Sequence, residues 1–78
     1  MKKTELRYRL KTVCAKSQIT RKDFVRKYWK LDLIPGMSID TAYRYISNML
    51  AESGSKIRPW LVTAIEMEEA ENENDNEG

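Results

Sequence analysis

The chain has 78 residues, of which 41% are hydrophobic, with two Trp, one Phe and no His. A chain of this size supports one small core and excludes a second domain and a roomy active-site cleft. The single cysteine, Cys14, has no partner for an internal disulfide, and without His we expect no metal site. We expect Cys14 to be a small buried hydrophobic residue.

The sequence carries no sign of a membrane or secretory segment. No apolar run approaches the roughly 18 residues that a membrane-spanning helix needs, and no charged-then-apolar leader ends in a cleavage site. We therefore expect a cytoplasmic protein that is intact from Met1 and has no membrane partner.

The formal net charge of +2 hides an uneven distribution of charge. All 14 Lys and Arg lie within residues 2–58, and the 14 cations less five acids leave this part a formal charge of +9. The other seven acids lie from Glu66 onward. So basic a segment favours a polyanion as partner, because each phosphate that Lys or Arg neutralises releases counterions. A basic solvated face without a ligand is the alternative interpretation.

Two helices are predicted in the first 30 residues. Residues 4–16 form the first, because their apolar residues recur at helical spacing in one stripe. That stripe consists of Leu6, Leu10, Val13 and Cys14. Thr20 is predicted to cap the second helix, since Asp23 stands three residues later as in a capping box. The second helix has a basic exposed face, and its buried face is predicted to hold Phe24, Val25 and Tyr28 or Trp29.

Residues 31–36 have no helical period and end in Pro35-Gly36, so the chain is expected to turn there. Pro35 disfavours a helical conformation at the residue before it, and Gly36 can adopt the positive φ of a tight turn. The apolar residues of this segment have two interpretations, a cover for the core or a dimer contact. They are Leu31, Leu33 and Ile34.

A third helix is predicted over residues 38–52, with Ser38 as its N-cap and Gly54 as a left-handed stop. Its inward side is expected to hold Met37, Ala42, Tyr45, Ile46 and Met49. A fourth helix is predicted to begin at Pro59 and to pack Trp60, Leu61, Ala64, Ile65 and Met67 over the others.

Residues 68–78 consist almost entirely of Glu, Asn and Asp, so we expect them to form a disordered acidic tail. Ordering such a segment loses backbone entropy without burying apolar surface. The tail has three interpretations: it aids solubility, it competes with DNA for the basic face, or it docks on a basic partner.

The third predicted helix has an outward stripe suited to contacts with DNA. Arg44 can form a fork onto guanine or bind a phosphate, Asn48 can pair with adenine, and Ile39 or Thr41 can contact a thymine methyl. Asp40 either accepts a hydrogen bond from cytosine or caps the helix and pairs with Arg44. The full outward set is Ser38, Ile39, Asp40, Thr41, Tyr43, Arg44, Ser47 and Asn48.

Other residues have a structural and a functional interpretation. The early basic residues Lys2, Lys3, Arg7 and Arg9 form either a solvated terminus or a flexible arm that reaches DNA. Tyr45 and Trp60 are interpreted as packing residues rather than as platforms for bases.

The residues Gly36-Met37-Ser38-x-x-Thr41-Ala42-Tyr43-Arg44-Tyr45-Ile46 resemble the Gly-Val-Ser-x-x-Thr-Val-Tyr-Arg-Tyr-Leu pattern of many bacterial and phage helix-turn-helix proteins. With residues 19–24 and 58–61, the layout is similar to a phage repressor or Cro-type (lambda repressor-like) domain over roughly residues 5–67. The resemblance implies a compact all-α bundle of four or five helices.

The resemblance also implies which residues meet DNA. It places Ser38, Ile39, Asp40, Tyr43 and Arg44 at positions that contact bases or backbone, and Thr20 at the start of a helix that crosses the phosphates, with Arg21 and Lys22 alongside. One departure is clear: the family joins its two helices by a turn of three or four residues, whereas 29–36 forms a longer segment here.

The sequence thus predicts a DNA-binding domain over residues 1–67 and a tail over 68–78. The expected partner is double-stranded DNA, bound as a homodimer by a small bacterial or phage transcriptional regulator such as a repressor. We expect no catalytic residues, cofactor or small-molecule substrate, because a His base, a thiol partner and a glycine-rich phosphate loop are all lacking. The alternative is a small helical adaptor that binds another protein through residues 31–34 and the tail.

Overall fold

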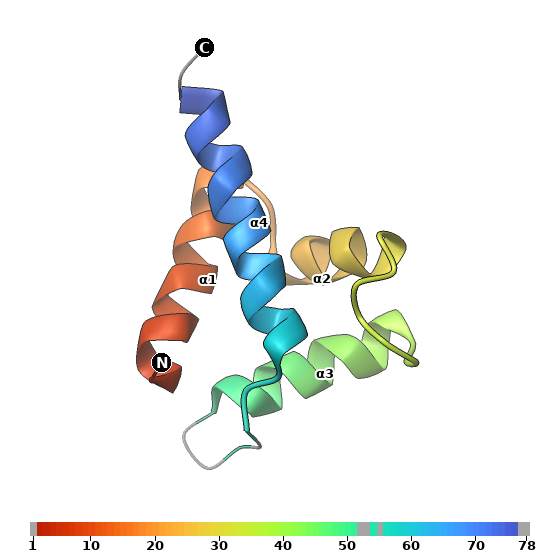
Figure 1. Ribbon diagram of the computed structural model, residues 1–78. Coiled ribbons are helices and arrows are strands. Elements are labelled where there is room, and N and C mark those ends of the chain that lie inside the picture. Colours follow the sequence, from red (N-terminus) through yellow and green to blue (C-terminus); the bar gives the residue numbers. More distant parts are fainter. Residues whose placement is uncertain (1, 52–53, 55, 77–78) are drawn as a thin grey trace.

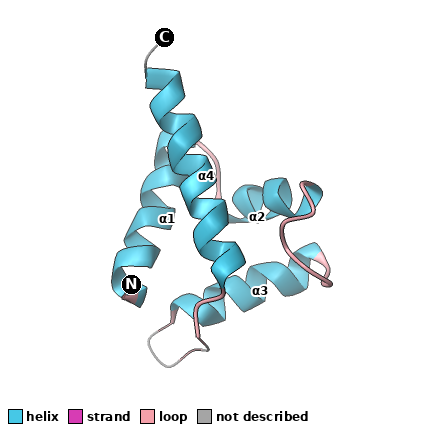
Figure 2. Cartoon of the chain, in the orientation of Figure 1, coloured by secondary structure: helices cyan, strands magenta, loops and turns pink. Residues whose placement is uncertain are grey.

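The computed structural model of the chain describes residues 2–51, 54 and 56–76, with side chains as far as Glu73. Over these residues the chain forms four helices and no strand, which confirms the all-α class (Figure 2). The helices are α1 (Lys3–Ser17), α2 (Arg21–Lys30), α3 (Ile39–Leu50) and α4 (Pro59–Asn76). Within the same residues, no helix is both long and apolar enough to cross a bilayer.

The helices α1 and α4 lie side by side and run in the same direction (Figure 1). The helices α2 and α3 pack against each other and against α1. The predicted apolar stripes meet in one core, in which Cys14 is buried as expected and burial raises the pKa of its thiol. The core consists of Leu6, Leu10, Val13, Cys14, Phe24, Val25, Tyr28, Ile34, Ala42, Ile46, Met49, Leu50, Leu61, Ala64 and Ile65.

Local signals set the start of α2 as the sequence predicts. The Thr20 hydroxyl accepts a hydrogen bond from the Asp23 backbone N–H at 3.1 Å, and the Asp23 carboxylate accepts one from the Thr20 N–H at 3.2 Å. This is the predicted capping box. Of the two aromatic candidates for the buried face of α2, Tyr28 is fully buried, whereas Trp29 is 38% exposed.

The loop over residues 31–38 is folded against the core. Ile34 is buried and Leu33 is partly buried, so these two residues cover the core, whereas Leu31 is 58% exposed. Gly36 adopts the predicted positive φ, at 58°. The indole N–H of Trp29 donates a hydrogen bond to the Met37 carbonyl at 2.6 Å, and this bond ties α2 to the residue before the N-cap of α3.

The predicted end of the third helix is wrong. The helix α3 ends at Leu50, and Ala51 has an extended backbone, so Gly54 does not serve as a left-handed cap. Gly54 is needed for close approach instead, because a Cβ there would lie 1.6 Å from the Asn48 carbonyl oxygen. The ammonium of Lys3 donates to the carbonyls of Ala51 and Gly54, at 3.2 and 2.8 Å. Lys3 lies in α1, and its side chain contacts backbone carbonyls at and after the end of α3. The interpretation of a flexible arm is therefore wrong for this residue.

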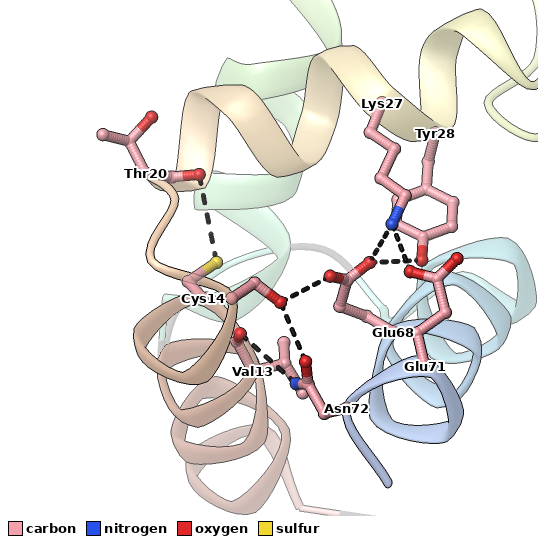
Figure 3. A network of polar contacts seen from close by, with 9 residues as sticks. Val13, Cys14, Thr20, Lys27, Tyr28, Glu68, Glu71 and Asn72 are labelled. Atoms are coloured by element: carbon pink, nitrogen blue, oxygen red, sulfur yellow. Dashed lines mark hydrogen bonds and ion pairs between the residues drawn. The ribbon is translucent and has the colours of Figure 1, made fainter. Parts of the chain in front are cut away.

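The prediction of a disordered tail over 68–78 is wrong for residues 68–76, which continue α4, while 77–78 lie outside the described residues. The physical reason is that the apolar stripe of α4 is extended by two polar residues. Glu68 and Asn72 are both buried, and they meet polar groups from α1 and α2 (Figure 3). The composition of this segment indicates that it buries no apolar surface. Its buried residues are polar instead, and their burial depends on polar partners.

Glu68 is the centre of this polar network. The residue is 3% exposed, and its carboxylate accepts hydrogen bonds from Ser17 Oγ at 2.6 Å, from Lys27 Nζ at 2.7 Å and from Tyr28 Oη at 2.7 Å (Figure 3). Asn72 donates to the Val13 carbonyl at 3.5 Å. Three helices thus share one buried carboxylate whose donors replace its lost hydration.

Two carboxylates of α4 make the stability of the fold depend on pH. Burial alone would raise the pKa of Glu68, but the hydrogen bonds from Lys27, Ser17 and Tyr28 outweigh it and lower that pKa. Hydrogen bonding to Arg9 lowers the pKa of Glu69. The folded chain therefore binds these two protons more weakly than the unfolded chain, so protonation favours unfolding.

We expect this contribution to be fully present above about pH 4.3, the usual pKa of Glu, and to be lost progressively as the pH falls below it. Urea unfolding at a series of pH values, followed by circular dichroism, measures the effect. Glu68→Gln cannot titrate at this position, so its midpoint is expected to fall less between neutral and acidic pH. An equal decline in both proteins would contradict the assignment to Glu68.

Candidate nucleic-acid interface

The helix α3 begins with the predicted cap. The Ser38 hydroxyl accepts a hydrogen bond from the Thr41 backbone N–H at 3.2 Å, so the first turn of α3 is held in a fixed geometry. On the inner side, Ala42, Ile46 and Met49 are fully buried as predicted, whereas Met37 and Tyr45 are partly buried and pack against the core. The inner stripe fixes which residues of α3 face the solvent.

The predicted outward set divides into two groups. Five residues are exposed: Ser38, Asp40, Thr41, Arg44 and Asn48. Three are partly buried: Ile39, Tyr43 and Ser47. Of these, Tyr43 packs against the core, so its side chain is a poorer candidate for contact with a ligand than sequence alone suggests.

The start of α2 lies beside α3. The ammonium of Lys22 forms an ion pair with Asp40 at 3.4 Å, and an Arg21 guanidinium nitrogen donates to Ser47 Oγ at 3.5 Å. Two basic residues of α2 are thus brought to the outer side of α3. The Thr20 hydroxyl, by contrast, is engaged in the cap of α2.

Asp40 does not have the predicted partner. One of its two sequence interpretations pairs it with Arg44, one turn along the same helix, whereas the structure pairs it with Lys22. The reason is that α2 passes close to the first turn of α3, a contact that spacing along one helix does not reveal. The pair is exposed, so it contributes little stability, and Lys22 can exchange Asp40 for another anion.

Sequence reasoning missed Arg58, which lies in the segment before α4. Its side chain is exposed, and its Nε donates to the Tyr45 hydroxyl at 3.1 Å. The Tyr45 ring meets the Trp60 ring edge-on, with centroids 6.2 Å apart, as the packing interpretation predicts. A shallow hollow beside this pair is lined by Thr41, Arg44, Tyr45 and Asn48. The fold brings Arg58 beside α3, so spacing along the sequence does not reveal this contact. The positive charge of Arg58 is the one signal in the sequence that could have marked it as a site residue.

The acids of α4 contact other cations. Among the described residues, Glu68 and Glu71 form ion pairs with Lys27, and Glu69 forms one with Arg9. Arg9 therefore packs against α4 and is not part of a flexible arm. These ion pairs with α4 do not involve Lys22 or Arg44, whose positive charges lie on the surface formed by α2 and α3. We call that surface the α3 face, and it consists of the N-cap Ser38, of Asp40, Thr41, Arg44 and Asn48 of α3, and of Arg21 and Lys22 of α2.

Comparison with known proteins finds no family model, curated protein or solved structure that matches this chain. What the α3 face can do follows from its own residues. It combines guanidinium, amide and hydroxyl groups of α3 with a guanidinium and an ammonium of α2, and these groups are donors to phosphate oxygens and to base edges.

Proposed function

We propose that this chain binds double-stranded DNA through the α3 face, as a small transcriptional regulator of the helix-turn-helix class. The observation that carries the proposal is the exposed polar stripe of α3 with two basic residues of α2 beside it. A helix with its side chains is about 10–12 Å wide, close to the width of the major groove of DNA. Phosphates on the side of the groove that faces α2 then meet its cations.

Three exposed side chains of α3 are spaced to meet successive base pairs. Thr41, Arg44 and Asn48 occupy one face of the helix and span about 10 Å along its axis. This length corresponds to about three base pairs. Arg44 suits the acceptors of guanine, Asn48 suits adenine, and the Thr41 methyl suits thymine. Since so few base pairs give limited specificity, a homodimer on paired half-sites accompanies this proposal.

The long connection between α2 and α3 is compatible with this function. Ile34 is buried in the core and Trp29 is bonded to Met37, so the loop holds the start of α3 in place. Lys22 and Arg21 reach α3 despite the extra residues. The packing of this loop also weakens the adaptor alternative. Ile34 and Leu33 pack inward, so Leu31 is the one of the three apolar loop residues that is left exposed for a partner.

Titration with duplex DNA of random sequence, about two helical turns long, tests the proposal. Binding that involves about five phosphate contacts is expected to weaken with salt along a log-log slope near −4 to −5. Measurements at about 50 and about 200 mM salt give the slope. Lys22→Gln is expected to make the slope less steep by about 0.9, whereas Lys11→Gln, an exposed change on α1, leaves it unchanged. If the chain shows no saturable binding to duplex DNA at either salt concentration, the proposed function is wrong.

A further inference from the structure

Arg58 is an exposed cation that is held in place by a residue of α3. Its Nε donates to the Tyr45 hydroxyl at 3.1 Å, and Tyr45 in turn is partly buried with its ring against Trp60. Arginine carries five N–H donors, so a bond through Nε leaves the two terminal nitrogens to form a fork onto an anion. The phenol therefore orients a guanidinium instead of neutralising it.

The surroundings of this pair indicate the kind of anion. Tyr45 also lines the hollow formed with Thr41, Arg44 and Asn48, so Arg58 adjoins the residues of α3 that we propose to meet DNA. Arg58 follows the end of α3, whereas Lys22 and Arg21 lie on the α2 side of the same helix. A duplex that receives α3 presents phosphates on both sides of the groove.

We propose that Arg58 binds a backbone phosphate of duplex DNA beside α3, and that Tyr45 is the positioning residue that orients its guanidinium. This inference rests on the proposed DNA-binding function. Orientation before binding matters because an unrestrained arginine loses rotational freedom when it meets a phosphate. The role of Arg58 is charge neutralisation, and the role of Tyr45 is to lower that entropic loss.

Two substitutions separate these roles. Arg58→Gln removes a phosphate contact, so the affinity for random-sequence duplex falls and the log-log salt slope becomes less steep by about 0.9. Tyr45→Phe keeps the ring and its contact with Trp60 but removes the hydroxyl. We expect it to weaken binding about 2- to 10-fold, the effect of releasing one side chain, with the slope unchanged because the charge remains.

The double variant distinguishes positioning from a general structural effect. In the Arg58→Gln background, Tyr45→Phe is expected to have no further effect on binding, because it acts through Arg58. Urea unfolding of each variant checks that the fold is retained. A full effect of Tyr45→Phe in that background overturns the positioning role.

A further control separates this inference from the proposed function. If Lys22→Gln reduces the salt slope and Arg58→Gln does not, the phosphate contact is disproved while DNA binding stands. If the unaltered protein has no saturable binding, the function itself fails. A reduced slope in both variants supports both proposals.

Discussion

Replacing Glu68 with Ala is expected to lower the free energy of unfolding by about 3 kcal/mol, because it leaves the buried Tyr28 hydroxyl without its acceptor and removes an ion-pair partner of the partly exposed Lys27. The substitution leaves Ser17, Lys27 and Tyr28 without their common acceptor. Tyr28 is fully buried, so its hydroxyl cannot gain a hydrogen bond to water without a change in packing. A small domain has a total stability of only about 5–15 kcal/mol, so this loss is a large part of it.

Urea unfolding followed by circular dichroism measures the change, and Glu66→Ala provides the matched control. Glu66 lies on the same helix and is exposed, so its replacement is expected to alter stability by less than about 0.5 kcal/mol. Equal midpoints for the two variants would show that the buried network contributes nothing measurable.

The position of Glu68 changes how the acidic end of the chain must be tested. Deleting residues 68–78 would show whether these acids compete with DNA, provided that they formed a disordered tail. In the structure the deletion also removes Glu68 and Asn72, which are buried against α1 and α2. The fold and the charge would change together. Substitution of the exposed Glu71, which pairs with Lys27 at the surface, changes charge with less effect on the core.

Signals that act over a few residues predicted much of the fold. Thr20 and Asp23 form the capping box, Ser38 caps α3, Gly36 has a positive φ and Pro59 begins α4. Each of these features depends on backbone geometry within one turn of helix, and the sequence displays it directly. Apolar periodicity likewise predicted the core stripes, because burial of one face repeats with the helix.

The errors concern contacts between residues far apart in the chain. Glu68 is buried because Lys27 and Tyr28 reach it across the fold, and Asp40 pairs with Lys22 of another helix. A carboxylate in an acidic stretch carries no local sign of such a partner. Gly54 differs in that Asn48 stands only six residues before it, but its need for a small side chain arises from the Asn48 carbonyl, which no turn pattern reveals.

Part of the candidate site was predictable for a related reason. The exposed polar stripe of α3 follows from helical periodicity, so Thr41, Arg44 and Asn48 were identified from sequence and are exposed in the structure. Arg58 was not, since the chain returns to α3 only after the connection between α3 and α4. Periodicity locates a face of one helix but not the residues that other segments bring beside it.

Replacing Arg44 with Ala is expected to weaken binding to a preferred DNA sequence by roughly 1–3 kcal/mol if the guanidinium contacts guanine. Arg44 is exposed and lies near the middle of α3, so its loss leaves the core intact. The preferred sequence is first selected from a random pool with the unaltered protein. Dissociation constants of the variant and of the unaltered protein are then measured for the selected duplex and for random duplex, at about 50 and about 200 mM salt.

Comparing the loss of affinity for the two duplexes shows whether Arg44 contacts a base or a phosphate. A base contact exists only on the selected sequence, so its loss reduces the preference for that sequence. A phosphate contact exists on every sequence, so its loss weakens both complexes equally and lowers the salt slope by about 0.9. Lys11→Ala, an exposed change on α1 outside the α3 face, is the control and should alter neither affinity. Unchanged binding of the Arg44 variant to both duplexes would exclude Arg44 from the interface and would contradict the placement of α3 in the groove.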